Sequence, residues 1–509
     1  MKFLKRILSR IVIVGLLIAL QVIWVVVVMH KLIAYSIWID IILKCISLTA
    51  ILILVGKEMN PAVKLAWVVP ILAFPLFGGL MYLLLYERKP TKHLRRELEN
   101  SDKRIMPLLT QDFKILKALD NIDRKYFCQE EYIRNYSGFP MYNHTKTVYF
   151  KSGEENYEVL LNELKRAEHF IFMEYFILRD GVMWNSIFEI LKQKAREGLD
   201  VRLIYDDVGS LMYLPYRYYE EVEQYGIRCE AFNHFVPYLS VVMNHRDHRK
   251  ITVIDGHTGF TGGINLGDEY INLTHEYGYW KDTGIMLKGE AVWSLTIMFL
   301  SLWNGLRPTD LTFDSFRPHQ FHYQEFCGCG YVQPYSDTPL DDENVGENVY
   351  LNMIHASEHY IYIFNPYLII DNEMMTALCL AAKRGVDVRI VTPGVSDSKV
   401  VFWLADSYFP QLTANGVKVY MYNPGFIHAK VFLCDDKAAC VGTFNMDYRS
   451  LYLHFECGVF LYKTESISSI KEDMLETLKQ STLLIQETLK RSLSMRFCQR
   501  ILRVIAPLL

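Results

Sequence analysis

Cysteine is sparse in this chain, with ten residues among 509. This is far below the density of small secreted domains that depend on disulfides. Several cysteines lie in apolar runs, as Cys434, Cys440 and Cys457 do, where a small buried side chain is the simplest interpretation. We therefore expect reduced thiols and a reducing compartment.

The chain also lacks an excess of charge of one sign. Its 54 Lys and Arg residues nearly balance 57 Asp and Glu residues, for a net charge of −3, which excludes an overtly basic nucleic-acid-binding protein. An apolar fraction of 51% with 22% charged residues excludes a disordered chain. The balance is uneven along the chain, because residues 1–86 carry +6 and residues 87–509 carry −9. The sequence therefore predicts a membrane region followed by a mildly acidic, enzyme-sized body.

Two stretches near the amino terminus are free of charge and long enough to cross a bilayer. Ile11–Met29 has 19 residues and Leu65–Tyr86 has 22, which suffices for about 30 Å of hydrocarbon at about 1.5 Å per residue. A third apolar stretch, Leu32–Gly56, is interrupted by Asp40 and Lys44. We therefore predict two or three transmembrane helices within residues 1–88 and a multi-pass protein of the cell membrane.

Basic residues flank this region on both sides. The positive-inside bias favours both flanks in the cytoplasm and hence an even number of spans, whereas three apolar stretches give an odd number. The number of spans thus stays open. We expect the part that follows to lie on the cytoplasmic side, after a basic, helical juxtamembrane linker at 89–140.

An internal repeat organises the remainder. His248–Asp255 and His428–Asp435 both read H-x-K-x4-D, at an offset of 180 residues. The same offset continues without a gap through four further pairs: Gly262 and Gly442, Asn265 and Asn445, Glu276 and Glu456, and Gly278 and Gly458. One such motif arises easily by chance, but two copies with the same downstream residues indicate a duplicated unit.

The residues upstream of each motif repeat as well. Gly198-Leu-Asp-Val-Arg resembles Gly385-Val-Asp-Val-Arg, and each follows a helical pattern and begins an apolar strand. Alternation of strands and helices predicts an α/β fold with buried, partly parallel strands. We therefore expect two similar α/β lobes, at 141–325 and 326–466, packed with pseudo-twofold symmetry.

The carboxyl-terminal stretch, 467–509, has a helical pattern of apolar residues interleaved with arginines. Two interpretations stay open for it: a helix on an anionic membrane surface, or a helix packed on the lobes.

The repeated residues suit phosphoryl chemistry. Residues i and i+2 of a strand face the same side, so His248 projects with Lys250 and His428 with Lys430. If the lobes face each other, two lysines and the amides of Asn265 and Asn445 surround one site, which suits a phosphodiester and a more negative transition state. No carboxylate cage, His/Asp cluster or phosphate-binding Gly-x4-Gly-Lys loop occurs, so no metal or cofactor is required.

Two histidines at one phosphorus predict a two-step displacement. One attacks phosphorus and the other transfers the protons of the departing and arriving alcohols. Each ring needs a carboxylate to fix its tautomer, and Glu276 and Glu456 are the candidates. Asp255 and Asp435 stand at turn openings, where a structural role is more natural than a chemical one.

The paired H-x-K-x4-D and G-[GST]-x-N motifs resemble the phospholipase D superfamily, in which two such lobes share one active site. The chain is further similar to bacterial cardiolipin synthases in three segments: Asn60-Pro61 through Pro75-Leu-Phe-Gly-Gly-Leu-Met-Tyr82, Asn445-Met-Asp-Tyr-Arg-Ser450, and Pro507-Leu-Leu509.

This resemblance implies a reaction in which two phosphatidylglycerol molecules become cardiolipin and glycerol. By resemblance, His248 is the nucleophile and His428 the acid and base, and the motif residues Asp255 and Asp435 belong to the same catalytic set. Lys250, Lys430, Asn265 and Asn445 hold the phosphate, and the partners are phosphatidylglycerol and other membrane lipids. No protein partner is indicated.

Two other functions stay open at this point. The chain resembles equally a phospholipase D-type hydrolase or a transphosphatidylase with another alcohol acceptor, because the acceptor alone chooses the product. A non-enzymatic, membrane-bound lipid-binding scaffold is the alternative from another class.

Overall fold

In the computed structural model of this chain, the described residues are 23–24, 26–28, 30–31, 37–73, 82, 92–234, 245–323 and 325–508. The chain divides into two compact units. We call Pro90–His234 with His245–Leu493 the main body, and Met1–Lys89, Phe235–Asn244 and Ser494–Leu509 the terminal unit.

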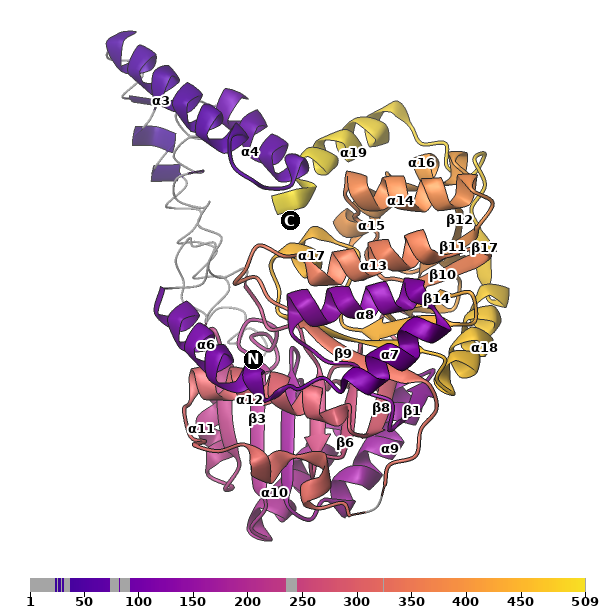
Figure 1. The fold of residues 1–509 in the computed structure, drawn as a ribbon. Helices are drawn as coiled ribbons and strands as arrows, with labels where there is room; N and C mark the ends of the chain where they lie inside the picture. Colours follow the sequence, from indigo (N-terminus) through magenta and orange to yellow (C-terminus); the bar gives the residue numbers. More distant parts are fainter. Residues whose placement is uncertain are drawn as a thin grey trace. The chain divides into compact units, whose positions relative to one another are not determined.

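The main body contains two large sheets (Figure 1), and their strands follow the same order. The first sheet runs β1-β8-β6-β5-β2-β3-β4, with bounds β1 Thr145–Phe150, β2 Phe170–Tyr175, β3 Asp200–Asp206, β4 Arg228–Phe232, β5 Ile251–Ile254, β6 Thr258–Gly262 and β8 Gly284–Gly289. The second runs β9-β16-β15-β14-β10-β11-β12-β17, with bounds β9 Tyr331–Asp337, β10 Tyr360–Phe364, β11 Asp387–Pro393, β12 Lys418–Tyr422, β14 Val431–Cys434, β15 Ala438–Gly442, β16 Glu456–Tyr462 and β17 Ser481–Leu483. Apart from β17, each strand of one sheet has its counterpart in the other, so the predicted pair of α/β lobes is confirmed.

Each sheet combines parallel and antiparallel pairs as expected. In the first, β2 and β3 pair in parallel, as do β3 and β4, while β5 pairs with β2 in the antiparallel sense. The second sheet repeats this with β10, β11, β12 and β14. Strands β2, β5 and β14 are buried along their whole length, which explains why their sequences are almost continuously apolar.

Helices cover both sheets (Figure 1). In the first lobe these are α9 Gly153–Arg166, α10 Val182–Arg196, α11 Tyr218–Glu223 and α12 Val292–Leu306; in the second they are α13 Val345–Ala356, α14 Asn372–Lys383, α15 Lys399–Asp406, α16 Phe409–Ala414, α17 Tyr448–Tyr452 and α18 Ser466–Lys479. The core of the first lobe forms where side chains of α9 and α10, such as Leu164 and Trp184, pack on Ile171 and Met173 of β2. Ser152 caps the start of α9 by accepting from the Glu155 amide, and Asp371 does the same for α14.

The main body is larger than the two predicted lobes. The expected linker at 89–140 contains α6 Lys92–Ile105, α7 Phe113–Ile122 and α8 Arg124–Ser137, of which α6 packs on α12 and α8 lies along α13 (Figure 1). The boundary predicted at 467 is wrong, because α18 and β17 belong to the second lobe and the main body extends to Leu493. The reason is structural: β17 adds a strand to the edge strand β12, and α18 packs on β1 of the first lobe.

The terminal unit is helical in its described part. It contains α3 Ile37–Val55, α4 Pro61–Ala73, nearly all of α19 Leu493–Ile505, and the short helix η6 Ala506–Leu508. Leu54, Trp67 and Ile71 belong to a small apolar core that joins α3 and α4, and α4 also contacts η6. Described helices from the amino-terminal and carboxyl-terminal regions of the chain therefore belong to one unit.

Within the described ranges, no helix is both long and apolar enough to cross a membrane. The predicted spans at Ile11–Met29 and Leu65–Tyr86 lie mostly outside the described residues.

The aspartate of each motif fastens two neighbouring strands. The carboxylate of Asp435 accepts hydrogen bonds from the amides of Glu358, His359 and Tyr360, at 2.7 to 2.9 Å, where β10 begins. Asp255 does the same at the start of β2, with three amides at 2.8 to 2.9 Å. Burial would raise the pKa of Asp435, but these amides outweigh it and hold the pKa below its usual value. Both aspartates are therefore structural.

We expect Asp435→Ala to lower the free energy of unfolding by roughly 2–4 kcal/mol, because three partly buried amides lose a charged acceptor. The matched control is Asp436→Ala, whose exposed carboxylate pairs with Lys471 at the surface and contributes less than about 1 kcal/mol. Urea unfolding of both variants measures the difference. Since the folded pKa of Asp435 is lowered, its contribution is present above the unfolded pKa of about 3.9 and is lost as the pH falls through the folded value. Equal losses in the two variants would contradict the assignment.

Candidate active site

The two motifs meet at one cavity of the main body. His248 stands just before β5 and His428 just before β14, and both rings line the same cavity of about 380 Å³. Asn265 and Asn445 line it as well. The residues that the repeat singled out in separate halves of the sequence are thus brought together.

Backbone hydrogen bonds between the lobes hold the two histidines in place. The amide of His248 donates to the carbonyl of Phe455 (2.9 Å), and the amide of His428 donates to the carbonyl of Lys281 (2.7 Å). The second contact continues a short parallel ladder between β7 Tyr279–Lys281 and β13 Gly425–Ile427. Each histidine therefore lies on a segment that is hydrogen-bonded to the opposite lobe.

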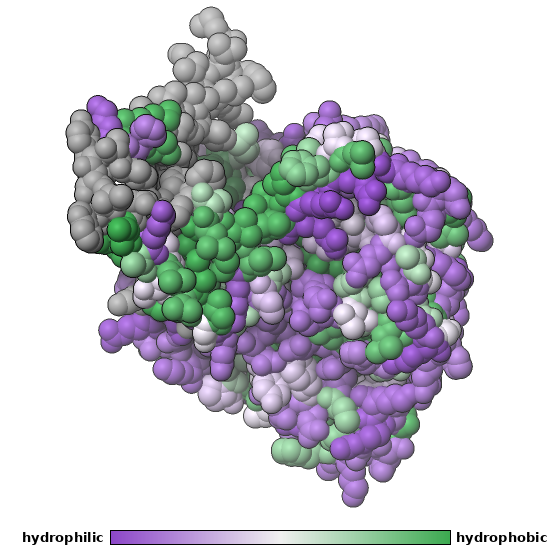
Figure 2. Space-filling model, turned by 90° about the horizontal axis from the view of Figure 1, so that it is seen from above, coloured by the Kyte–Doolittle hydropathy of each residue, from purple (hydrophilic) through white to green (hydrophobic). Residues whose placement is uncertain are grey.

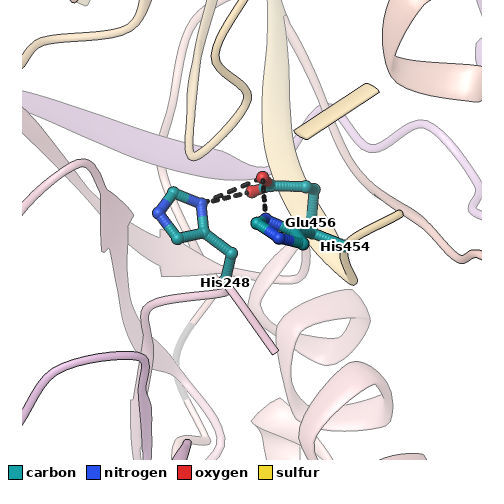
Figure 3. A group of neighbouring side chains, drawn as sticks. All are labelled: His248, His454 and Glu456. Atoms are coloured by element: carbon teal, nitrogen blue, oxygen red, sulfur yellow. Dashed lines mark hydrogen bonds and ion pairs between the residues drawn. The ribbon is translucent and has the colours of Figure 1, made fainter. Parts of the chain in front are cut away.

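Each imidazole is also paired with a carboxylate of the opposite lobe. Nδ1 of His248 lies 2.9 and 3.0 Å from the two oxygens of Glu456 (Figure 3), and Nδ1 of His428 lies 2.6 Å from Oδ2 of Asp282. A carboxylate accepts a hydrogen bond, so the proton of each neutral ring resides on Nδ1. Nε2 of each ring then carries the lone pair that a nucleophile or base needs.

The role expected for Glu276 is wrong, because Asp282 pairs with His428 instead. Glu276 lines the cavity, but no hydrogen bond of the described residues joins it to either ring. The gapless alignment of the two halves fails here: Gly262 pairs with Gly284 in the first sheet, while Gly442 pairs with Gly458 in the second. Asp282 and Glu456 are therefore equivalent, although they are 174 rather than 180 residues apart.

The sequence itself contains a signal for this change of offset between the two halves. Asp282-Thr283-Gly284 and Glu456-Cys457-Gly458 share an acid, one intervening residue and a glycine, and an apolar strand follows each.

The two motif lysines lie buried beside the histidines. Nζ of Lys250 donates to the carbonyl of His248 (2.5 Å), while Nζ of Lys430 donates to the carbonyl of His428 and lies 2.9 Å from its Nδ1. Burial lowers the pKa of Lys250 to about 8 and that of Lys430 to about 7. A bound anion would raise both pKa values again, so this site favours a negatively charged ligand.

Burial also keeps both imidazoles neutral. It lowers the pKa of His248 well below its usual value, and the positive charge of Lys250 adds to the effect. Burial and Lys430 lower the pKa of His428 to about 4, although Asp282 opposes them. Burial would raise the pKa of Asp282, but the adjacent His428 and Lys430 outweigh it and keep the pKa below its ordinary value. At neutral pH the site thus presents two neutral rings, each with a lone pair on Nε2.

The two motif asparagines are not equivalent. The side chain of Asn265 accepts from the Ile177 amide (3.0 Å) and donates to the Tyr270 hydroxyl (2.7 Å). The side-chain oxygen of Asn445 is buried and has no hydrogen-bond partner. The side-chain oxygen of Asn445 can therefore accept a hydrogen bond from a donor in the cavity, such as a ligand hydroxyl.

The cavity walls break the pseudo-symmetry. By the same register, His454 beside His248 corresponds to Trp280 beside His428, and ring centroids are 5.7 and 5.4 Å apart in the two pairs. Burial lowers the pKa of His454 well below its usual value, and neither of its ring nitrogens has a hydrogen-bond partner. One wall thus offers a neutral polar ring and the other an aromatic face. Neither residue was predicted, because no repeated motif contains them.

Among the described residues, one group of side chains is close enough to share a metal ion: His248, His454 and Glu456, whose ligand atoms lie within 4.8 Å of one another (Figure 3). Two of the three are already joined by the hydrogen bond on Nδ1 of His248. A cation there would have to displace the proton that orients this ring, so the donor set fits a proton better than a metal.

Comparison with known proteins places this site in a family. The family model described as "Cardiolipin synthase, PLD-like domain" matches residues 160–293 and 350–478, which cover both lobes. The chain belongs to this phospholipase D-like cardiolipin synthase family. A second family model, "Phospholipase_D-nuclease N-terminal", matches residues 45–85.

Relatives in this family match over nearly the whole chain. A protein described as "Cardiolipin synthase" from a Geobacillus species is 34% identical over 487 residues, which covers 92% of this chain and 93% of the relative. "Cardiolipin synthase 2" of Bacillus cereus is 35% identical over 460 residues, with 89% and 88% covered. Among solved structures, the phosphatidylserine synthase of Haemophilus influenzae covers 75% of this chain and 97% of its own, with a TM-score of 0.57 at 13% identity, and so shares the fold.

The pairing of Asp282 with His428 makes a discriminating prediction. We expect Asp282→Asn to reduce kcat by roughly 10²- to 10⁴-fold, because an amide can donate to Nδ1 and stabilise the wrong tautomer. Glu276→Gln is the matched control and should change kcat by less than about tenfold. Steady-state kinetics of the two variants, with ¹⁵N NMR of the His428 tautomer, provides the measurement. A larger loss in Glu276→Gln would show that the carboxylates are assigned the wrong way round.

Proposed function

We propose that this protein is a cardiolipin synthase, which transfers the phosphatidyl group of one phosphatidylglycerol to another and releases glycerol. The observation that carries the proposal is the pair of neutral histidines at one cavity, each oriented by a carboxylate of the opposite lobe. The relatives named cardiolipin synthase support the choice of substrate.

In the first step, Nε2 of His248 attacks phosphorus and the bond to the glycerol oxygen breaks. His428, as imidazolium, gives its Nε2 proton to that oxygen, and glycerol leaves. The phosphodiester anion and the developing negative charge favour this protonated state, since they oppose the burial that lowers the pKa of His428. The product is a phosphatidyl group on Nε2 of His248, whose positive ring faces Glu456.

In the second step, the neutral His428 takes the proton from a primary hydroxyl of the second phosphatidylglycerol. The resulting oxygen attacks phosphorus, the bond to Nε2 of His248 breaks, and cardiolipin forms. Lys250 and Lys430 place about two positive charges beside the five-coordinate phosphorus. Asn445 lines the same cavity, and its side-chain NH2 group can donate to a phosphate oxygen. The assignment of His248 as nucleophile rests on the family resemblance, because both rings have the same kind of carboxylate partner.

We further propose that the protein is a multi-pass membrane protein with its main body in the cytoplasm. The charge-free runs Ile11–Met29 and Leu65–Tyr86 and their basic flanks support this location. A membrane-held site would meet lipid hydroxyls at high local concentration, which favours transfer to lipid over transfer to water.

Water or another alcohol as acceptor is the competing function, since either would react with the same phosphohistidine. Labelled phosphatidylglycerol in bilayers separates the outcomes: cardiolipin and glycerol support the synthase, whereas a large excess of phosphatidate supports a hydrolase. A scaffold would give no product.

A substrate with an activated leaving group distinguishes the two histidines. With phosphatidyl-p-nitrophenol, whose leaving group needs no acid, we expect His428→Ala to release one equivalent of nitrophenolate in a burst and then stall as the covalent intermediate. His248→Ala should show no burst, and both variants should lose turnover of phosphatidylglycerol by on the order of 10³-fold or more. Stopped-flow absorbance and radiolabel retained on alkali-denatured protein report these events. A burst only in His248→Ala would reverse the roles, and retained turnover in both variants would refute the mechanism.

The lowered lysine pKa values predict opposite effects of pH on stability and on substrate binding. Without a bound anion, Lys430 and Lys250 lose their protons above about pH 7 and pH 8. In the unfolded chain both lysines keep their protons up to about pH 10.4. The unfolded state therefore binds more protons between about pH 7 and 10.4, and the free energy of unfolding rises with pH over this range. A phosphodiester needs the charged lysines, so KM should rise over the same window and binding should take up protons. Calorimetry of a non-hydrolysable phosphatidylglycerol analogue in buffers of different ionisation enthalpy measures this uptake. Proton release on binding would contradict the account.

A further inference from the structure

The last helix of the chain exposes its apolar side. On α19, Leu493, Phe497 and Ile501 are 82%, 64% and 49% exposed and follow one another at four-residue spacing, so they form one stripe along the helix. Gln499, which lies on another side of the helix, is buried. A helix that packs on a soluble protein has the reverse arrangement, with its apolar side turned inward.

Charge of one sign accompanies this stripe. Residues 490–509 contain five basic residues and no acidic residue. Arg496 and Arg500 lie one turn apart beside the stripe, both exposed, and neither is in an ion pair among the described residues. An apolar stripe flanked by arginines is the pattern of a helix that lies in the interface of an anionic bilayer.

The remainder of the terminal unit presents the same kind of surface. Ile46 and Leu52 of α3 and Leu65 and Leu72 of α4 are exposed apolar residues, and α4 contacts η6, which directly follows α19. The view from above in Figure 2 shows apolar residues gathered in a band bordered by hydrophilic ones. A large exposed apolar surface marks an interaction site. In this protein such surface is found on α19 and also on α3 and α4 of the same unit.

The segment that leads into α19 is fixed to the main body. Arg491 binds Asp406 at the end of α15 through two hydrogen bonds of 2.9 and 2.7 Å. Such a two-pronged pair is geometrically specific, and it fixes the last residues of the main body before the terminal unit begins.

We propose that α19 lies in the plane of an anionic membrane surface, with Leu493, Phe497 and Ile501 in the apolar layer and Arg496 and Arg500 on lipid phosphates. The partner that this helix contacts is the headgroup layer of a lipid bilayer. The apolar stripe can insert at the boundary between headgroups and acyl chains, and the arginines can bind anionic lipid phosphates. This inference does not depend on the catalytic assignment.

Spin-label depth measurements test this proposal on the full chain. The label is placed at Ile501→Cys after the exposed cysteines Cys45, Cys128, Cys327, Cys329 and Cys498 are changed to Ser. A label at Leu311→Cys, an exposed position of the main body, is the matched control. Vesicles of phosphatidylcholine alone are compared with vesicles that also contain phosphatidylglycerol.

We expect the label at residue 501 to become accessible to oxygen and protected from a water-soluble nickel complex in the anionic vesicles, while the label at residue 311 stays aqueous. Arg496→Gln and Arg500→Gln should each lower the ratio of immersed to aqueous label by roughly fivefold. Lys490→Gln, which precedes the helix, should lower it less.

A label at residue 501 that stays aqueous in anionic vesicles would overturn the proposal. So would protection without vesicles accompanied by spin–spin broadening, because a second copy of the chain would then cover the stripe. The same immersion is expected with His248→Ala in the background. Loss of the synthase activity and loss of the membrane contact are therefore separate results.

Discussion

Each lobe of the main body supplies the carboxylate that orients the histidine of the other. Glu456 holds the ring of His248 and Asp282 holds the ring of His428, and backbone hydrogen bonds at Phe455 and Lys281 bring these segments together. Neither lobe contains a complete site alone. The cavity, the tautomers and the position of both lysines therefore depend on how the two lobes dock.

This docking creates a buried site whose charges favour an anion. Each neutral ring has one buried motif lysine and one carboxylate of the opposite lobe beside it, and burial lowers the pKa of both lysines. A bound phosphodiester adds a negative charge that favours the charged form of both lysines, whereas a neutral ligand would not shift this balance. The motif aspartates take no part in this balance, because Asp255 and Asp435 accept hydrogen bonds from backbone amides at the far ends of β5 and β14.

The sequence was sufficient to predict the lobes and the residues that meet, because H-x-K-x4-D is a local strand pattern and its duplication implies symmetry. It did not predict the partner of His428, since the equivalent positions shift from an offset of 180 to 174 between Asn265 and Asp282. Trp280 and His454 were missed for a different reason, because they belong to no repeated motif. Only the folded structure shows that they lie beside His428 and His248. The boundary at 467 failed because β17 is short and its partner β12 is distant in sequence.

Soaking the protein with vanadate and determining its crystal structure tests the central claim most directly, because vanadate adopts the five-coordinate geometry of a phosphoryl transition state. The account predicts one vanadium in the cavity, bonded to Nε2 of one histidine and facing Nε2 of the other in line, with Lys250 and Lys430 beside its oxygens. Vanadate bound to only one motif, with the second ring turned away or its Nδ1 separated from the carboxylate of the opposite lobe, would contradict it.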